Sequence, residues 1–415
     1  MENQSATALR RDGQLKKFFN LWAIVYVFIF IAFSQFIPSM PFYEKFIVWV
    51  GKTFLHIKDL HKIERTGSGD TTYDYVLVFV NIIISCFISL IILITDHKRK
   101  TYRQLYLFTI VIARYYVAYT MLSYGFAKIF NGQFPGNGYY RLEEKVGDMS
   151  PMGMVWTFMG ASRTYTFVSG LLECIGGALL LFRKTKTFGS LFSMTVMLNV
   201  ALLNFMYDVP VKIFSTHIVL LCIFMLTYEW KILFNFFVKH RTEKLDYNKL
   251  RVRKKWMQIS LRAIKILLIA YLLYSNITGL WFTLKEDKIP MEGVYTVNTF
   301  ILDKDTISAN TNEQDSTGWN KIYVAYKEGI SITHNNQKSQ WLPAKIDTTK
   351  QLFDVKNQDS TQFALLNYSL NKDTVIFTGN IKNLPAKIIT VRKTKKDYSL
   401  TNRGFHWINE YPPNW

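Results

Sequence analysis

The residues best suited to chemistry in this chain are ionisable side chains inside or beside long apolar stretches. Arg114 and Lys128 lie in one such stretch, Glu173 lies in the next, and His217 lies near the start of a later one. Asp208 belongs to the short turn that precedes His217. Because charged groups are costly in hydrocarbon, each is expected either to be paired or to serve a ligand or a proton pathway.

Two kinds of chemistry follow from these residue types. His217, Glu173 and Asp208 can exchange protons, which makes them the candidate catalytic groups. Arg114 and Lys128 are hydrogen-bond donors suited to an anionic or carbonyl oxygen. A quinone ring needs both a donor for its carbonyl oxygen and a titratable group for the proton. The predicted ligand-binding set is completed by three polar or aromatic residues, Tyr124, Asn199 and Asn204.

A structural role accounts for the same residues, and the two roles stay open. Arg114 and Glu173 are expected at similar depths, where they would form a buried ion pair that holds two helices together. Both roles predict that these two charged groups lie within salt-bridge distance. Lys128 would extend its ammonium group to the lipid headgroups, and His217 would hydrogen-bond a neighbouring carbonyl group. Gly176–Gly177 indicates close packing between helices.

A metal or haem centre is not expected. His217 is the one histidine inside the apolar stretches, whereas haem and copper centres need two or more clustered ligands. The three cysteines, Cys86, Cys174 and Cys222, include no CxxC pair and behave as small apolar residues. No nucleophile elbow, HExxH motif or dinucleotide fingerprint occurs.

Membrane-spanning helices must position these side chains. A bilayer core needs about 20 mostly apolar residues per helix. Seven stretches qualify, at residues 18–38, 75–95, 105–130, 165–182, 188–207, 213–230 and 259–282. Lys and Arg are more than twice as frequent at the N-terminus and in alternate loops as in the remaining loops. The sequence therefore predicts an all-α polytopic bundle over residues 18–283, preceded by a cytoplasmic tail over residues 1–17.

The C-terminal segment, residues 284–415, has a different character. Short runs rich in β-branched and aromatic residues alternate with turn residues, which predicts a small all-β domain, a sandwich or a barrel. An odd number of spans places it on the extracytoplasmic side. Most of the net charge of +20 belongs to the membrane half, where cytoplasmic loops explain it, so the expected partner is the lipid bilayer rather than nucleic acid.

Two loops between the predicted spans carry their own signals. Residues 42–62 show apolar positions at helical spacing, which predicts an amphipathic helix in the membrane interface. Asp70 then precedes the second span and is expected to cap it. The loop at residues 131–163 is long and rich in glycine at its start, which is typical of a lid.

The middle of the chain resembles the DoxX-like integral membrane proteins. Arg114 followed by Tyr124-Gly-Phe-Ala-Lys128 resembles their arginine and terminal glycine–lysine pattern, as does Leu172-Glu-Cys-Ile-Gly-Gly177 followed by Arg183. The resemblance covers residues 105–230. The additional segments look like a longer Bacteroidetes-type subgroup, and the four-helix unit is also similar to vitamin K-dependent carboxylase-like membrane proteins. The family resemblance implies an inner-membrane protein linked to quinones, thiol redox chemistry and other redox subunits, although the chain lacks a paired cysteine motif.

Two functional hypotheses follow from this. The first is a quinone- or lipid-ligand-binding oxidoreductase subunit whose polar pocket lies in the outer half of the bundle. The second is a non-catalytic membrane scaffold or assembly factor that acts through its C-terminal β domain. A transporter is less favoured, because no inverted repeat or pair of broken helices stands out.

Overall fold

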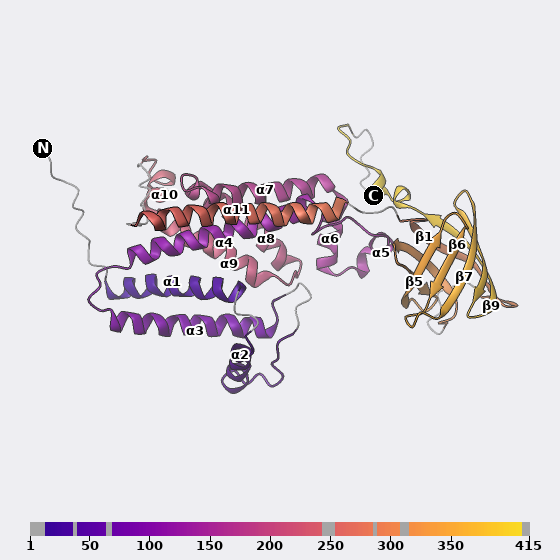
Figure 1. The fold of residues 1–415 in the computed structure, drawn as a ribbon, viewed down its shortest axis with the longest axis horizontal. Helices are drawn as coiled ribbons and strands as arrows, with labels where there is room; N and C mark the ends of the chain where they lie inside the picture. The colour runs from indigo at the N-terminus through magenta and orange to yellow at the C-terminus, as the bar shows by residue number, and fades with distance from the viewer. Residues whose placement is uncertain are drawn as a thin grey trace. The chain divides into compact units, whose positions relative to one another are not determined.

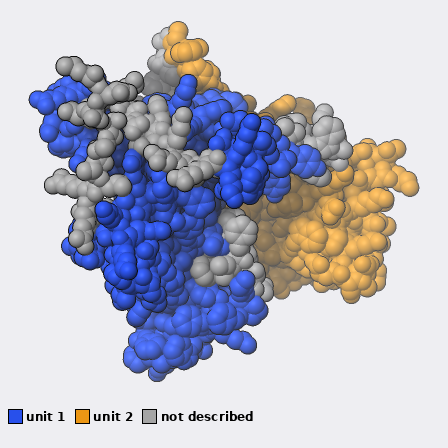
Figure 2. All heavy atoms as spheres, turned by 60° about the vertical axis from the view of Figure 1, so that its left-hand side comes forward, with its two compact units in different colours: residues 1–134, 164–281 blue, residues 135–163, 282–415 orange. Residues whose placement is uncertain are grey.

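The computed structural model describes residues 13–35, 40–63, 69–242, 254–284, 289–307 and 315–408. The chain divides into two compact units, which Figure 2 colours separately. The first unit holds residues 1–134 and 164–281, and the second holds residues 135–163 and 282–415. The described strands all lie in the second unit.

Six helices in the described residues are long and apolar enough to cross a membrane. They are α1 (Gln14–Gln35), α3 (Thr72–Thr95), α4 (Arg103–Ile129), α7 (Arg163–Leu181), α8 (Lys186–Met206) and α11 (Lys255–Leu284) (Figure 1). The remaining predicted span, residues 213–230, is not one straight helix. It forms α9 (Lys212–Thr227), which bends by 86° into α10 (Trp230–Phe237), and this bent pair is the seventh candidate span.

Glycines let α4 and α7 approach closely. A Cβ atom at Gly170 would lie 2.6 Å from the carbonyl oxygen of Gly125, and one at Gly177 would lie 2.8 Å from a side-chain carbon of Leu122. Small residues at such contacts are how helices pack when no water is expelled between them. The prediction of close packing at Gly176–Gly177 is confirmed, and this packing fixes the axial alignment of α4 and α7.

The predicted amphipathic helix is α2 (Pro41–Thr53). Its Tyr43 and Ile47 are buried in a cluster with residues of α3, and the Tyr43 hydroxyl donates to Asn81 Oδ1 at 2.6 Å. Phe42 and Trp49 are exposed on the other side. One side of α2 therefore packs against α3, whereas the apolar side chains of Phe42 and Trp49 on its other side are not covered by the protein.

Asp70 does not cap the helix that follows it, which corrects the prediction. Thr71 caps α3 instead, in a reciprocal capping box with Asp74. The Asp70 carboxylate accepts hydrogen bonds from the backbone N–H groups of Lys212 (2.6 Å) and Ile213 (2.9 Å) at the start of α9. Asp70 is in the left-handed region, with φ of 61°, and this turn carries its side chain to the unpaired donors of a distant helix.

The β domain is a closed barrel. Neighbouring strands pair antiparallel in chain order, and β1 also pairs with β9, which closes eight strands while β2 extends β1 at one edge. Four fully buried aromatic side chains, Tyr295, Phe300, Phe353 and Phe377, fill the interior. The strands are β1 (Gly293–Leu302), β2 (Asp305–Ile307), β3 (Trp319–Tyr326), β4 (Gly329–His334), β5 (Ser339–Asp347), β6 (Leu352–Lys356), β7 (Gln362–Asn371), β8 (Thr374–Ile381) and β9 (Leu384–Lys393).

Residues 135–163 are folded into the same unit as the barrel. They form α5 (Tyr139–Glu143), the 3-10 turn η1 (Val146–Asp148) and α6 (Pro151–Ala161), while η2 (Lys395–Asp397) and α12 (Ser399–Asn402) follow β9. The Glu143 carboxylate accepts hydrogen bonds from Lys321 and, at 2.5 Å, from the Tyr398 hydroxyl. This segment is therefore held to the barrel unit, where the sequence suggested a loop able to act as a lid.

The surroundings of Glu143 favour its charged form. Burial alone would raise the pKa of this carboxyl group. The hydrogen bonds from Lys321 and Tyr398, together with the nearby ammonium groups of Lys321 and Lys393, outweigh burial and hold the pKa below its ordinary value. Burial of the Tyr398 ring, together with the nearby Glu143 carboxylate, raises the pKa of Tyr398.

Candidate functional site

A buried ion pair joins α4 to α7. Lys128 Nζ lies 2.7 Å from Glu173 Oε1 and 2.8 Å from Glu173 Oε2. Lys128 is 5% exposed and Glu173 is 1% exposed. The glycine contacts described above bring the two backbones together at this level, since the Gly170 position also faces Lys128 Cβ.

The predicted pairing of Glu173 with Arg114 is wrong, because Lys128 takes that place. Arg114 lies over the ring of Tyr115, with 4.8 Å between the guanidinium carbon and the ring centroid. Its buried Nε has no hydrogen-bond partner among the described residues. Arg114 and Lys128 are separated by about 21 Å along the axis of α4 at 1.5 Å per residue, so Glu173 meets just one of them.

His217 forms a second buried polar pair, with Tyr26 of α1. His217 Nε2 lies 2.7 Å from the Tyr26 hydroxyl, and Nδ1 lies 2.7 Å from the carbonyl oxygen of Ile213. Because a carbonyl can only accept, Nδ1 carries the hydrogen and Nε2 accepts from Tyr26 in the neutral ring. The ring of Phe30 stacks on the imidazole at 4.3 Å with an interplanar angle of 8°.

Asn204 and Asn199 do not share a site. Asn204 Nδ2 donates to Ser215 Oγ at 3.0 Å between α8 and α9, whereas Asn199 is exposed on α8. The two residues are five positions apart, which is about 140° around a helix, so both cannot face the interior. The expectation that Asn199 lies in an interior pocket is therefore not met.

Asp208 also lies away from the buried pairs. It is exposed in the turn after α8 and forms an ion pair of 2.7 Å with Lys212. Its φ of 51° places it in the left-handed conformation of a tight turn, where the side chain leaves the bundle. The structure thus separates Asp208 from Glu173 and His217, the two other groups predicted to exchange protons.

Aromatic rings extend from both polar pairs along α4. Tyr124 is 43% exposed, and its ring centroid lies 5.9 Å from Lys128 Nζ and 6.1 Å from the Phe214 ring. Further along α4, the ring of Tyr116 lies 6.0 Å from Phe30, which stacks on His217. Tyr26 and Phe30 were missed as site residues, although they lie four residues apart on one face of the first span.

The chemistry available here is that of proton exchange and hydrogen bonding to a ligand. No group of three or more His, Cys, Asp or Glu residues in the described part of the chain is arranged to hold a metal ion. The three cysteines are free thiols on α3, α7 and α9. The two buried polar pairs described above are an ammonium–carboxylate pair and an imidazole–phenol pair.

Comparison with known proteins finds a similar bacterial protein. The chain is 31% identical over 113 residues to the uncharacterized protein YwoB of Bacillus subtilis (strain 168), and the match covers 27% of this chain and 71% of that protein. The chain belongs to the YwoB family. No family model and no solved structure matches the chain.

Proposed function

We propose that the chain is a multi-pass inner-membrane protein that binds a quinone or similar ring-bearing lipid beside the Lys128–Glu173 pair. In this proposal it is a DoxX-like oxidoreductase subunit with its N-terminus in the cytoplasm and its barrel in the periplasm. One observation carries the proposal: a fully buried ion pair lies next to the half-exposed aromatic ring of Tyr124. A ligand that reaches Tyr124 from the lipid also reaches the edge of the ion pair.

The Lys128 ammonium group has the donors that such a ligand requires. It donates to both oxygens of Glu173, and an ammonium group carries three N–H bonds, so one remains to donate to a carbonyl oxygen. Glu173 is a carboxylate that can take or release a proton at the same place. Tyr124 offers a flat face for a ring. A bound quinone would supply the electron-accepting chemistry.

The His217–Tyr26 pair supports a proton role elsewhere in the same bundle. The imidazole can accept a proton at Nε2, after which that nitrogen donates to the Tyr26 oxygen and the hydrogen bond is kept with its direction reversed. Phe30 and Tyr116 connect this pair with α4, which also carries Lys128. His217 and Glu173 are therefore the two groups to which we assign proton exchange.

Co-purification of a quinone tests this proposal. The full chain is purified in a mild detergent, and its lipid extract is measured by mass spectrometry alongside Lys128→Met and Glu173→Gln. Lys62→Met is the matched control, because Lys62 forms a half-exposed ion pair with Glu44 at 3.1 Å. We expect the quinone with the wild type and with Lys62→Met, and its loss from both variants of the buried pair.

Loss of folding would also remove a ligand, so a double variant separates the two explanations. Lys128→Met/Glu173→Leu removes both charges together, which leaves no unpaired charge in the interior. If this variant folds as well as the wild type and still retains the quinone, the buried pair does not form the binding site. Retention of the quinone by Lys128→Met would lead to the same conclusion.

The barrel favours a second candidate function, that of a scaffold or assembly factor. A hollow of about 500 Å³ at one end of the barrel is lined by Trp319, His334, Phe363 and Lys382, among others. The buried Nδ1 of His334 has no hydrogen-bond partner within the described residues. A partner protein that co-purifies with the full chain, is lost on deleting residues 284–415, and comes without bound quinone would favour this function over the first.

A further inference from the structure

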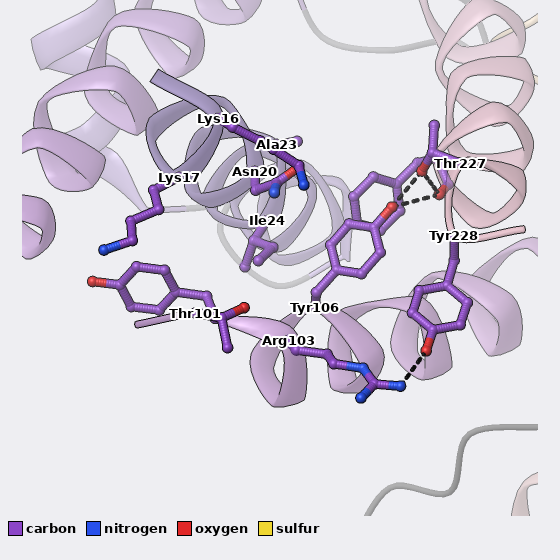
Figure 3. A pocket seen from close by; sticks show the side chains of 12 residues that line it. Lys16, Lys17, Asn20, Ala23, Ile24, Thr101, Arg103, Tyr106, Thr227 and Tyr228 are labelled. Atoms are coloured by element: carbon purple, nitrogen blue, oxygen red, sulfur yellow. Dashed lines mark hydrogen bonds between the residues drawn. The ribbon is translucent and has the colours of Figure 1, made fainter. Parts of the chain in front are cut away.

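A basic hollow lies where α1 and α4 begin and α9 ends (Figure 3). It has a volume of about 410 Å³. Three cationic side chains line it, Lys16 and Lys17 from α1 and Arg103 from α4, and none of its twelve lining residues is acidic. Figure 3 shows Lys16 and Arg103 on different helices around the same space, with Tyr106 between them. We call this hollow the basic pocket.

Two of the cations donate hydrogen bonds to uncharged groups. Lys17 is buried, and its ammonium group donates to the carbonyl oxygen of Arg99 at 2.9 Å. The Arg103 guanidinium group donates to the Tyr228 hydroxyl at 3.0 Å, as the dashed line in Figure 3 shows. Hydrogen bonds of this kind orient a cation without cancelling its charge. The lining of the pocket thus contains three cationic side chains and no acidic side chain.

One buried hydroxyl group in the pocket is unsatisfied. Tyr102 lines the pocket and is 6% exposed, yet its hydroxyl group has no hydrogen-bond partner among the described residues. Buried polar groups are nearly always paired, so an orphan in a native structure calls for an unseen partner. An acceptor oxygen on a ligand in the pocket would provide one. Tyr102 thus points to a ligand independently of the three cations.

Part of the lining of the pocket is apolar. Ile24 is 1% exposed, and Phe224 contributes a ring that contacts Tyr106 at 5.0 Å between centroids. A free inorganic anion has no apolar groups to bury against these side chains, whereas the glycerol and first methylene groups of a lipid would be buried against them. The pocket also lies at helix ends, which is the level of the headgroups for a helix that spans the bilayer.

We propose that the basic pocket binds the phosphate group of an anionic membrane phospholipid. Lys16, Lys17 and Arg103 contribute the positive charge, the Tyr102 hydroxyl donates to a phosphate oxygen, and Ile24 and Phe224 contact the apolar part. Basic pockets between membrane helices on the cytoplasmic side bind such headgroups. The proposal rests on the membrane insertion and orientation given above, but not on the quinone site, which lies at the other end of α4.

Binding of phosphatidylglycerol to the full chain tests the proposal. The protein is titrated in phosphatidylcholine nanodiscs with and without phosphatidylglycerol, and bound lipid is measured by native mass spectrometry. Lys17→Ala/Arg103→Ala is expected to weaken phosphatidylglycerol binding by at least about 100-fold, since each direct hydrogen bond to a charged group contributes about tenfold or more. The matched control, Lys98→Ala/Lys100→Ala, removes the same charge from exposed positions of the adjacent loop that do not line the pocket, and it should bind like the wild type.

Tyr102→Phe keeps the test decisive if the double variant folds poorly. It removes one orphan hydroxyl group and nothing else, so we expect unchanged or higher thermal stability in phosphatidylcholine alone. With phosphatidylglycerol present, we expect a smaller stabilisation by the lipid than in the wild type. If phosphatidylglycerol stabilises Tyr102→Phe and the wild type equally, the Tyr102 hydroxyl group does not contact the lipid.

Three outcomes would overturn the proposal as a whole. The first is equal loss of phosphatidylglycerol binding in the Lys98→Ala/Lys100→Ala control, because it would show a general effect of charge. The second is binding of phosphatidylcholine as tight as that of phosphatidylglycerol. The third is displacement of phosphatidylglycerol by inorganic phosphate at similar concentration, because it would assign the pocket to a free anion rather than to a lipid.

Discussion

Removing one partner of the Lys128–Glu173 pair should destabilise the helical unit strongly, and unequally for the two partners. Lys128→Met leaves the Glu173 carboxylate without a partner at 1% exposure. An uncompensated charge of this kind costs about 3–5 kcal/mol. Glu173 is short and lies well inside α7, which extends from Arg163 to Leu181, so its carboxylate has no route to the headgroups.

Glu173→Leu should cost less, because Lys128 has such a route. Lys128 is the penultimate residue of α4, which ends at Ile129, and a lysine near a helix end can extend its ammonium group to the interface. We therefore expect a loss below about 3 kcal/mol for Glu173→Leu. The double variant Lys128→Met/Glu173→Leu should be close to wild type or more stable by about 1–4 kcal/mol, because no charge is left in the interior.

Reversible unfolding of the four proteins in mixed detergent measures these differences as a double-mutant cycle. The coupling free energy between the two positions should be large, since the atoms in contact are 2.7 Å apart and buried. Equal losses below about 1 kcal/mol for both single variants, with additive behaviour in the double variant, would refute the reasoning. That result would mean that water reaches the pair and that it behaves like a surface ion pair.

Three further perturbations test other parts of the structure. Asp70→Ala should destabilise the start of α9 by about 0.5–2 kcal/mol, because two backbone N–H groups lose their acceptor; thermal unfolding against exposed Asp59→Ala measures this loss. Gly170→Ala should cost at least about 1–3 kcal/mol, because its Cβ atom would meet the Gly125 carbonyl oxygen at 2.6 Å, whereas Gly138→Ala has no heavy atom within 4 Å of the new carbon and should be neutral. Glu143 has a lowered pKa in the folded state, so its contribution to folding stability is complete above the ordinary pKa of 4.5 and is lost as the pH falls below that value. An unfolding midpoint that depends on pH as strongly in Glu143→Gln as in the wild type would exclude this role.

The spans could be predicted because length and apolarity alone define them. The bent seventh span was not predicted, because length and apolarity do not reveal a bend. The predicted span over residues 213–230 includes Glu229. In the structure this carboxylate is buried, forms an ion pair of 2.7 Å with Lys186, and accepts a hydrogen bond from Thr187. The start of α8 thus fixes Glu229, and the chain turns there. Tertiary contacts of this kind cannot be predicted from the hydropathy of a local stretch of sequence.

The sequence predicted that the C-terminal domain is all-β, but it did not predict that the sheet closes into a barrel. The β-rich runs of the sequence, at residues 293–301, 321–326, 363–368, 374–378 and 387–391, lie within β1, β3, β7, β8 and β9, whereas β2, β4, β5 and β6 were missed. In β5, Pro343 and charged residues break the local pattern, yet Pro343 pairs with Gly329 in the barrel. The pairing of β1 with β9 decides between barrel and sandwich, and it joins residues almost a hundred positions apart, beyond the reach of a local pattern.

The candidate site was predicted by residue type but not by pairing. Arg114, Lys128, Glu173 and His217 are all buried, as predicted for charged groups within apolar stretches. Their partners depend on how far α7 is displaced along α4, and that displacement is set by contacts such as Gly125 with Gly170. Sequence spacing placed Arg114 and Glu173 at similar depths and so predicted an ion pair between them. The glycine contacts instead align Glu173 with Lys128.

The two proposed sites occupy opposite ends of one helix, and this separation has an energetic consequence. Arg103 and Lys128 are about 37 Å apart along α4 at 1.5 Å per residue, more than the thickness of the hydrocarbon core. Sites so far apart with no shared partner usually act additively, within about 0.5 kcal/mol. Combining Lys17→Ala/Arg103→Ala with Lys128→Met should therefore give the sum of their effects on stability and leave each ligand affinity as in the separate variants. A deviation beyond that limit would mean that the two ends of α4 are energetically coupled and would refute their independence.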